Sequence, residues 1–183
     1  VNGRGKIQAL ASADFSGKSI MTVRGCDHFM MSGVRINSAI TDHAKVPVAG
    51  LAVGRGTALQ GAGSIKLFNS LYISGMFSLA ALYAPAAEQM TWLQCAFWNK
   101  WVPTTPGDSD PSCVYYDTDN DTYELLNGEA NSNTCRYFVG CTFIKSTNDF
   151  NHDIIVLEGI QSDVSFRDCY TAFIDSTSGS QGG

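Results

Sequence analysis

The chain has 183 residues, of which 44% are hydrophobic and 16% are charged, and it carries a formal net charge of −5. This length and composition exclude a disordered chain and predict one folded domain with a sizeable core. The acidic balance argues against a nucleic-acid partner, and the absence of an apolar run of ~18 residues argues against insertion in a membrane.

Copies of a short apolar pattern follow one another along the chain. Each copy alternates apolar residues with a period of two, skips one residue, and then places a Cys or Leu at an anchor position. Period-two alternation predicts a β-strand, and the skipped residue predicts a bend into a second short strand. In chain order the copies occupy residues 21–26, 46–53, 68–73, 90–97, 138–143 and 164–169.

The regular recurrence of the pattern predicts a fold built by stacking repeats. A rung of two or three short strands cannot bury its apolar side alone, so each rung stacks on its neighbours. We therefore expect an all-β, parallel β-solenoid of about seven rungs, roughly 30 Å tall. The long interval between the fourth and fifth copies leaves room for one further rung. A β-sandwich of short, regularly spaced strands is the alternative.

The bend positions hold residues that tolerate turn geometry, and the anchor positions hold Cys or Leu. The bend residues are Gly25, Gly50, Ser70, Gly140 and Asp168, and the anchors are Cys26, Leu51, Leu71, Cys95, Cys141 and Cys169. We expect the six anchors to form one interior row of the core. Cysteine in such a row acts as a small buried hydrophobic residue, and a thiol-rich core predicts folding in a reducing cytosol. The absence of a CxxC spacing weighs against a metal site.

Four residues depart from the pattern, and two of them, His28 and Thr171, stand where the last apolar residue of a copy is expected. Lys66 and Arg136 stand where the first apolar residue of a copy is expected, and we expect them to be half exposed at the beginnings of their strands. Cys113 and Cys135 lie outside the copies and could form a disulfide only under oxidising conditions.

Charge and composition divide the chain into segments. Residues 1–17 form a leading segment, residues 18–175 form the solenoid, and residues 176–183 form a Gly/Ser-rich tail. Residues 103–135 contain seven acidic residues and no basic one, and Pro and Gly interrupt the repeat there. We expect this stretch to project as a loop excursion, which is a common location for a binding site.

The carboxylates of the excursion suggest two kinds of chemistry. Asp117, Asp119 and Asp121 are spaced like the beginning of a calcium-binding loop, but Thr122 and Gly128 stand where that loop needs Gly and Glu. A solvated acidic loop is the alternative, and no metal or cofactor is expected. Paired carboxylates could instead cleave a glycosidic bond. The candidate catalytic residues are Asp117, Asp119, Asp121 and Glu124.

Aromatic side chains beside these carboxylates and nearby amides are typical of a surface that binds a sugar ring. The candidates for sugar contact are Trp98, Trp101, Tyr115, Tyr116 and Tyr123. Their alternative role is to pack the excursion onto the solenoid. Trp92 falls on the interior register and is expected in the core. Because seven carboxylates repel an anionic polymer, we expect a neutral or amino-bearing saccharide.

Three segments carry a resemblance to a known family. Residues 90–99, 136–143 and 164–170 resemble coils of the pectate-lyase-type, single-stranded right-handed parallel β-helix. The chain is similar to the β-helical part of bacteriophage tailspikes and related tail appendages. The resemblance implies a homotrimer in the virion, folded in the host cytoplasm, that binds and sometimes cleaves bacterial surface polysaccharide. No active-site residue of that family can be assigned to a position of this chain from the resemblance.

Three functions remain open at this point. The first is a tailspike-type module that recognises host polysaccharide, the second is a polysaccharide hydrolase or lyase, and the third is a structural decoration or stalk component of a virion. The outward positions Thr22, Pro47, Leu67, Thr91, Tyr137 and Ser165 are uncharged, which favours packing of parallel columns in a homotrimer.

Overall fold

The computed structural model describes residues 5–24, 28–54, 65–85, 89–102, 111–117, 136–147, 153–157 and 164–175. These residues form parallel strands in three sheets, which are here named A, B and C. Sheet A contains β1 (Gly5–Ala9), β4 (Val34–Ser38), β7 (Tyr72–Gly75), β10 (Ala96–Asn99), β13 (Thr142–Thr147) and β16 (Tyr170–Asp175). Sheet B contains β2 (Met21–Arg24), β5 (Ala49–Gly54), β8 (Ala80–Pro85), β11 (Ser112–Asp117) and β14 (Ile155–Leu157). Sheet C contains β3 (His28–Ser32), β6 (Ile65–Asn69), β9 (Met90–Leu93), β12 (Arg136–Val139) and β15 (Val164–Arg167).

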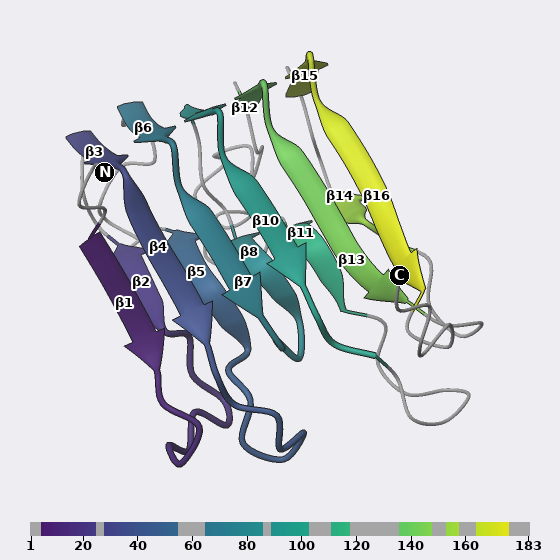
Figure 1. The fold of residues 1–183 in the computed structure, drawn as a ribbon. Helices are drawn as coiled ribbons and strands as arrows, with labels where there is room; N and C mark the ends of the chain where they lie inside the picture. The colour runs from purple at the N-terminus through teal and green to yellow at the C-terminus, as the bar shows by residue number, and fades with distance from the viewer. Residues whose placement is uncertain are drawn as a thin grey trace, which may run out of the picture.

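Each sheet takes every third strand of the chain, so the backbone passes through sheets A, B and C in turn. Figure 1 shows the result as a column with β1 at one end and β16 at the other. This connectivity is consistent with a parallel β-helix and excludes the β-sandwich, whose sheets are antiparallel. Among the described residues there is no helix long and apolar enough to cross a membrane.

The expected number of rungs is not confirmed. The longest described sheet contains six strands, and β10 pairs directly with β13. The expected additional rung between Cys95 and Cys141 is therefore absent. The chain between these residues is long because it makes one turn of the column that includes β11, together with segments outside the described residues.

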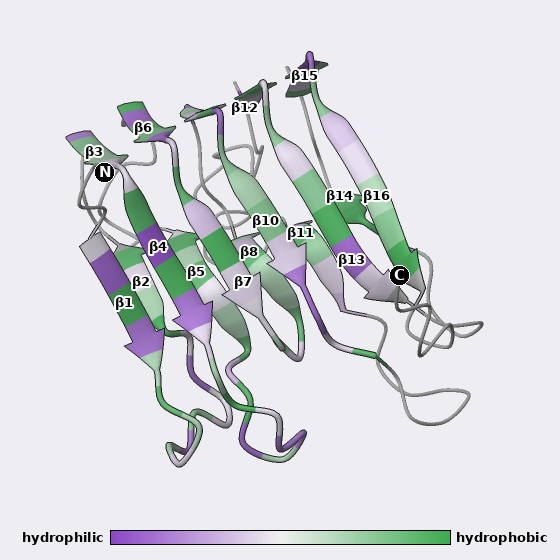
Figure 2. Cartoon of the chain, in the orientation of Figure 1, coloured by the Kyte–Doolittle hydropathy of each residue, from purple (hydrophilic) through white to green (hydrophobic). Residues whose placement is uncertain are grey.

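The core is built from in-register rows of apolar side chains. In sheet C the rings of Phe68, Trp92, Phe138 and Phe166 form a row, with stacked centroids 4.0 Å, 6.2 Å and 4.9 Å apart in that order. The expectation that Trp92 belongs to the core is confirmed, since it is fully buried. Figure 2 shows hydrophobic bands crossing neighbouring strands of sheet A, where Ile36, Ile73, Phe97 and Phe143 are in register.

The corner between sheets C and A repeats one backbone conformation. In each turn that the structure describes, the residue at this corner has a left-handed φ, between 49° and 68°. These residues are Gly33, Ser70, Gln94, Gly140 and Asp168. A residue with left-handed φ bends the backbone sharply, here from a strand of sheet C into a strand of sheet A. The bends expected at Ser70, Gly140 and Asp168 are thereby confirmed. Gly50 is instead a buried residue inside β5, and Gly25 lies outside the described residues.

Four of the six anchors form the expected row. Leu71, Cys95, Cys141 and Cys169 each follow a left-handed corner residue, and the backbone N–H of Ala96, Thr142 and Tyr170 donates to the carbonyl of the anchor one rung before. The Cys141 thiol also donates to the carbonyl oxygen of Trp92, 3.3 Å away. The prediction that Leu51 belongs to the anchor row is wrong, because Leu51 lies in sheet B between Met21 and Leu82. Cys26 lies outside the described residues.

The expected half-exposure of two cations is also wrong. Lys66 is 4% exposed and Arg136 is fully buried. Both occupy a row of sheet C that includes Met90, so the register that buries Met90 buries them as well. The Arg136 guanidinium lies 4.6 Å from the centroid of the Tyr116 ring, an arrangement that offsets part of the cost of burying its charge.

Two of the expected segments contain strands of the column. Residues 1–17 include β1, which pairs with β4 along its length. The expected excursion at 103–135 includes β11, which pairs with β8 on one side and β14 on the other. That stretch is therefore not a continuous loop, because β11 supplies the sheet B strand of its turn.

Candidate functional site

Two of the aromatic residues expected to contact sugar are buried. Tyr116 is fully buried in β11, and its hydroxyl oxygen accepts a 2.9 Å hydrogen bond from Nε1 of Trp92. Burial raises the pKa of this hydroxyl above its usual range. In this fold Tyr116 is a core residue with no solvent-facing surface, so its assignment to sugar contact is corrected.

Trp101 is 7% exposed and packs in a second cluster with Ala9, Ile40 and Val46. The ring of His43 lies 4.2 Å from the Trp101 ring, and His43 itself is exposed in a turn. Trp101 therefore fixes the loops at one end of the strands of sheet A, and its assignment to sugar contact is corrected for the same reason.

The acidic residues of the predicted site fall mostly outside the described part of the chain. Asp119, Asp121, Tyr123 and Glu124 all lie there, and of Asp117 only the backbone at the end of β11 is described. Among the described residues no group of three metal-ligating side chains occurs. The catalytic candidates stay a prediction.

Tyr115 and Trp98 are the two predicted sugar-contact residues that the structure leaves partly exposed. Tyr115 lies on the outer side of sheet B, beside Tyr83, with ring centroids 5.9 Å apart. Trp98 lies on the outer side of sheet A, between Ser74 of β7 and Ile144 of β13. The two residues thus belong to different faces of the column, and they do not form one site.

The surroundings of Trp98 combine an aromatic ring with a positive charge. Nζ of Lys100 lies 4.1 Å from the centroid of the Trp98 ring, which is a cation–π contact. Nε1 of Trp98 has no hydrogen-bond partner among the described residues. Lys100 is exposed, so its ammonium group is held over the indole while remaining accessible to solvent.

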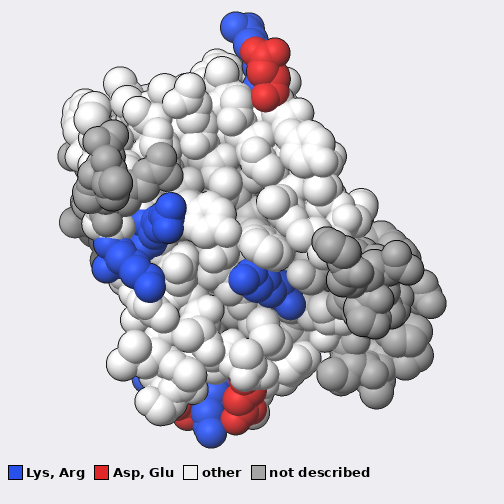
Figure 3. All heavy atoms as spheres, in the orientation of Figure 1, with Lys and Arg blue, Asp and Glu red and all other residues white. Residues whose placement is uncertain are grey.

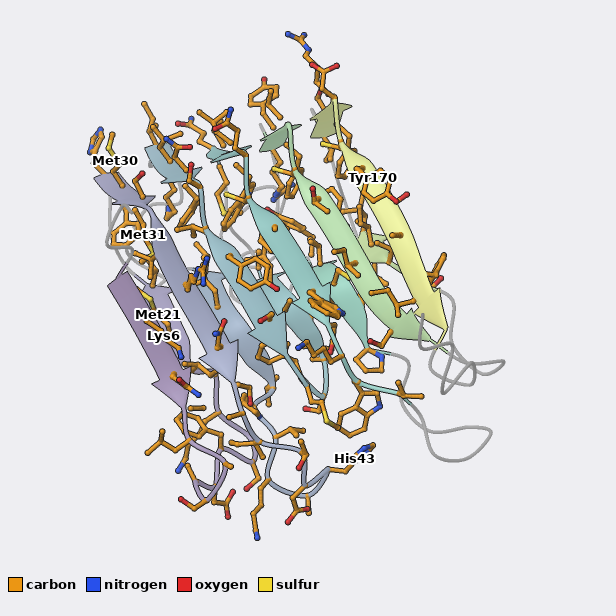
Figure 4. All side chains as sticks on the ribbon, viewed as in Figure 1. Lys6, Met21, Met30, Met31, His43 and Tyr170 are labelled. Carbon is orange, nitrogen blue, oxygen red and sulfur yellow. The ribbon has the colours of Figure 1, made fainter. Side chains whose placement is uncertain are left out.

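Further aromatic and basic side chains share this outer surface, which is here named the sheet A face. Its members are Lys6, Arg35, Tyr72, Trp98, Lys100 and Tyr170. Lys6 pairs in register with Arg35, and Arg35 with Tyr72, whose ring centroid is 5.9 Å from the Arg35 guanidinium carbon. Figure 4 labels Lys6 on β1 and Tyr170 on β16, at opposite ends of the sheet.

The charged side chains that the structure describes on the sheet A face are all positive. The strands of sheet A contain a single acidic residue, Asp175, at the end of β16. In Figure 3 basic groups lie over the middle of this side of the molecule, whereas acidic groups are seen only at its upper and lower margins. A flat positive surface with aromatic rings can bind groups with hydroxyl or carboxylate oxygens through hydrogen bonds and stacking.

The backbone beneath Trp98 and Lys100 is held by Asn99. This residue is fully buried; its Oδ1 accepts from the backbone N–H groups of Phe77 (3.2 Å) and Trp101 (3.0 Å). Its Nδ2 donates to the carbonyl oxygens of Phe77 (3.1 Å) and Ser112 (2.9 Å). The side chains on either side of Asn99 therefore project from a fixed backbone, as a preorganised surface requires.

The described cysteines are free thiols, and two of them, Cys113 and Cys141, are unsuited to act as nucleophiles. Cys113 is a buried free thiol whose Sγ donates to the carbonyl oxygen of Ile144 at 2.8 Å, and Cys135 lies outside the described residues. Burial raises the pKa of the Cys113 thiol to about 12. A hydrogen bond with Cys95 and burial raise the pKa of Cys141. Both thiols are therefore protonated near neutral pH and are poor nucleophiles.

Sequence reasoning identified Trp98 but missed Lys6, Arg35, Tyr72, Lys100 and Tyr170. A usable signal was present, because Tyr72 and Tyr170 directly follow the anchors Leu71 and Cys169. The residue after an anchor is the first of a new strand and points to the opposite side from the core. Lys6 and Arg35 carried no such signal, since their strands lie outside the copies recognised in the sequence.

No family model matches the chain, and comparison with the curated proteins and with the solved structures gave no significant match. The function must therefore be inferred from the parallel three-sheet column and from the geometry of its surface.

Proposed function

We propose that this chain is the right-handed, pectate-lyase-type β-helical module of a bacteriophage tailspike or related tail appendage, and that it recognises a polysaccharide of the bacterial surface. The three-sheet parallel column supports the architecture in its coarser form. The resemblance of residues 90–99, 136–143 and 164–170 to coils of that fold supports the finer assignment. A fold alone does not establish a function, so the assignment of a function depends on the chemistry of the surface.

The observation that carries the proposal is the placement of Trp98 and Lys100 on the sheet A face. An indole and an ammonium group in contact, on a backbone held by Asn99, offer a sugar both an apolar surface and a hydrogen-bond donor. Arg35 and Tyr72 repeat the combination nearer the other end of the sheet. A repeating polymer is suited to a surface that presents similar groups on successive strands.

The charge of the sheet A face widens the class of acceptable glycans. The expectation of a neutral or amino-bearing saccharide came from the acidic stretch at 103–135. Lys6, Arg35 and Lys100 on the sheet A face would attract rather than repel a polymer with carboxylate groups. Acidic and neutral bacterial polysaccharides therefore both belong to the class that we propose.

We also propose that three columns pack in parallel as a homotrimer through sheet C. The outward row of this sheet contains Met30, Leu67, Thr91, Tyr137 and Ser165, none of which is charged. Met30 is 71% exposed and Tyr137 is 43% exposed in the single chain. Exposed apolar side chains in an uncharged row favour contact with a sister chain.

A polysaccharide array combined with an assay for new reducing ends tests the proposed function. We expect binding to at least one neutral or acidic bacterial surface polysaccharide without release of reducing ends. Release of reducing ends from a bound polysaccharide would instead identify a depolymerase. A lack of binding to every polysaccharide on the array would contradict recognition of glycans.

A further inference from the structure

A hollow of about 420 Å³ lies at the corner between sheets C and A, apart from the Trp98 surface. It is lined by Asn69, Leu93, Gln94, Val139, Gly140 and Asp168. These residues belong to four successive turns of the column, because β6, β9, β12 and β15 are consecutive neighbours in sheet C. The volume is within the range of small-molecule sites, roughly 300–1,000 Å³.

The hollow exists because glycine occupies one corner of a row. Gln94, Gly140 and Asp168 occupy the same left-handed corner position of three successive turns, with φ values of 49°, 62° and 53°. Gln94 and Asp168 project side chains, whereas Gly140 between them has none. The backbone there is fixed, since the N–H of Gln94 donates to the carbonyl of Val139 and the N–H of Gly140 donates to the carbonyl of Arg167.

The lining has an apolar part and a polar part. Leu93 and Val139 are half-buried residues of neighbouring strands, whereas the side chains of Gln94 and Asp168 are exposed. The Oδ1 of Asn69 accepts a 3.0 Å hydrogen bond from the hydroxyl group of Ser70. This bond fixes the orientation of the Asn69 amide group, and therefore the direction in which its Nδ2 points. Amide and carboxylate groups beside an aliphatic surface match the two sides of a sugar ring, its hydroxyl groups and its C–H face.

We propose that this corner hollow is a subsite for one neutral pyranose ring of a glycan. The C–H face of the ring would lie on Leu93 and Val139, Gln94 would donate or accept at one hydroxyl, and Asp168 would accept from another. The carboxylate of Asp168 disfavours a uronic acid in this position because like charges repel. This subsite rests on the proposed function, but it is separate from the sheet A face and is tested separately.

The substitution Gly140→Gln tests the subsite by filling it. Gln94 already holds this side chain at the same corner of the preceding turn with φ 49°, so the fold tolerates the backbone strain, which is similar at Gly140 and at the control position Gly33. A Cβ at Gly140 would approach no closer than 3.6 Å, to Cγ of Gln94, which is an ordinary contact. Gly33→Gln is the matched control, because Gly33 has φ 68° and a Cβ there would meet nothing within 4 Å.

Binding is measured by saturation-transfer difference NMR with the methyl glycosides of glucose, galactose, mannose and rhamnose, and with glucuronate as the acidic comparison. We expect at least one neutral glycoside to bind to the wild type and to Gly33→Gln but not to Gly140→Gln. Asp168→Asn should weaken that binding about tenfold, as loss of a charged hydrogen-bond acceptor does. Glucuronate should not bind in the hollow.

The outcomes separate this inference from the proposed function. Wild-type protein that binds a polysaccharide on the array, but whose binding of every glycoside is unchanged by Gly140→Gln, would overturn the subsite and leave glycan recognition intact. Preferential binding of glucuronate that Gly140→Gln abolishes would overturn the neutral specificity. Absence of binding to any polysaccharide and to any glycoside would overturn both proposals.

Discussion

Asn99 shows how a single buried amide organises one corner of this column. Its side chain takes part in four hydrogen bonds, to the backbone of Phe77, Trp101 and Ser112, and so links the end of β10 with the beginning of β11. No apolar residue can replace these bonds, and buried polar backbone groups are costly when unpaired. The fixed position of Trp98 and Lys100 depends on this residue.

Asn99→Ala should therefore reduce the free energy of unfolding by ~2–4 kcal/mol, because each buried group left without a partner costs ~1–3 kcal/mol. Chemical denaturation measures the change. Asn37→Ala is the control, since Asn37 is only partly buried and its Oδ1 accepts one 3.2 Å bond from Ser74. Equal effects of the two substitutions would show that Asn99 does not link the two strands.

Cys113 should make the column sensitive to alkali. Its pKa is raised from the usual 9.0 to about 12 in the folded state, so the unfolded chain loses its proton first. Stability from this group is complete below pH ~9 and is lost as the pH rises toward 12, at up to ~1.4 kcal/mol per pH unit. The free energy of unfolding, measured by denaturation at a series of pH values, should fall less steeply with rising pH in Cys113→Ala, by an amount that corresponds to about one proton. An identical slope in the two proteins would contradict the burial of the thiol.

Single residues were predicted well only where a strand had been recognised. Trp92 was placed in the core because residues 90–97 carry a clear period-two pattern. Tyr116 was misassigned because no strand was expected at 112–117, so the side to which it points could not be derived. Lys66 and Arg136 were misassigned for another reason, since sequence alone does not reveal the neighbours that make a buried charge tolerable.

At the scale of elements, strand spacing along the chain was less informative than strand pairing. Copies at 21–26 and 46–53 have the same alternation as the later copies, yet their strands β2 and β5 belong to sheet B. The later copies begin in sheet C and bend into sheet A. Alternation identifies a strand but not its sheet, and this explains why Leu51 was assigned to the wrong row.

The close packing of neighbouring turns predicts a strong requirement for glycine at position 75. Gly75 has φ 150°, and an added Cβ would lie 2.9 Å from the backbone nitrogen of Ser38 on the neighbouring strand. Gly75→Ala should cost ~2–4 kcal/mol, because backbone strain and overpacking add together. Thermal and urea denaturation measure this cost.

Gly33→Ala provides the comparison for this prediction. Gly33 also has positive φ, but an added Cβ would meet nothing within 4 Å. The substitution should therefore cost only about 1 kcal/mol, from the backbone conformation alone. If Gly75→Ala were no more destabilising than Gly33→Ala, then β4 and β7 would not approach as closely as the register requires.

At the scale of the whole molecule, the fold class was predictable and the site only in part. Stacked rungs followed from the recurrence of one pattern, whereas the length of the connections between strands obscured the number of turns. The sheet A face is assembled from strands far apart in the sequence, so its basic and aromatic residues come together only in the folded column. Most of the acidic stretch at 103–135 stays a prediction.

The uncharged outward row of sheet C predicts the assembly state. Tyr137→Lys places a charge in the middle of this row and should convert a homotrimer to a monomer, because a buried unpaired charge is costly. Multi-angle light scattering measures the mass. Thr22 was expected in the same outward row but lies at an exposed position in β2 of sheet B, so Thr22→Lys should leave the trimer intact. A wild-type monomer at micromolar concentration would contradict trimerisation.

The most direct test of glycan recognition compares the two faces that carry a partly exposed aromatic residue. Binding to the polysaccharide identified on the array is measured by biolayer interferometry for the wild type, Trp98→Ala and Tyr115→Ala, each checked for an unchanged thermal transition. We predict that Trp98→Ala weakens binding about tenfold, equivalent to ~1.4 kcal/mol, and that Tyr115→Ala, on the outer side of sheet B, has no effect. Unchanged binding by Trp98→Ala, or loss of binding in Tyr115→Ala alone, would contradict recognition through the sheet A face.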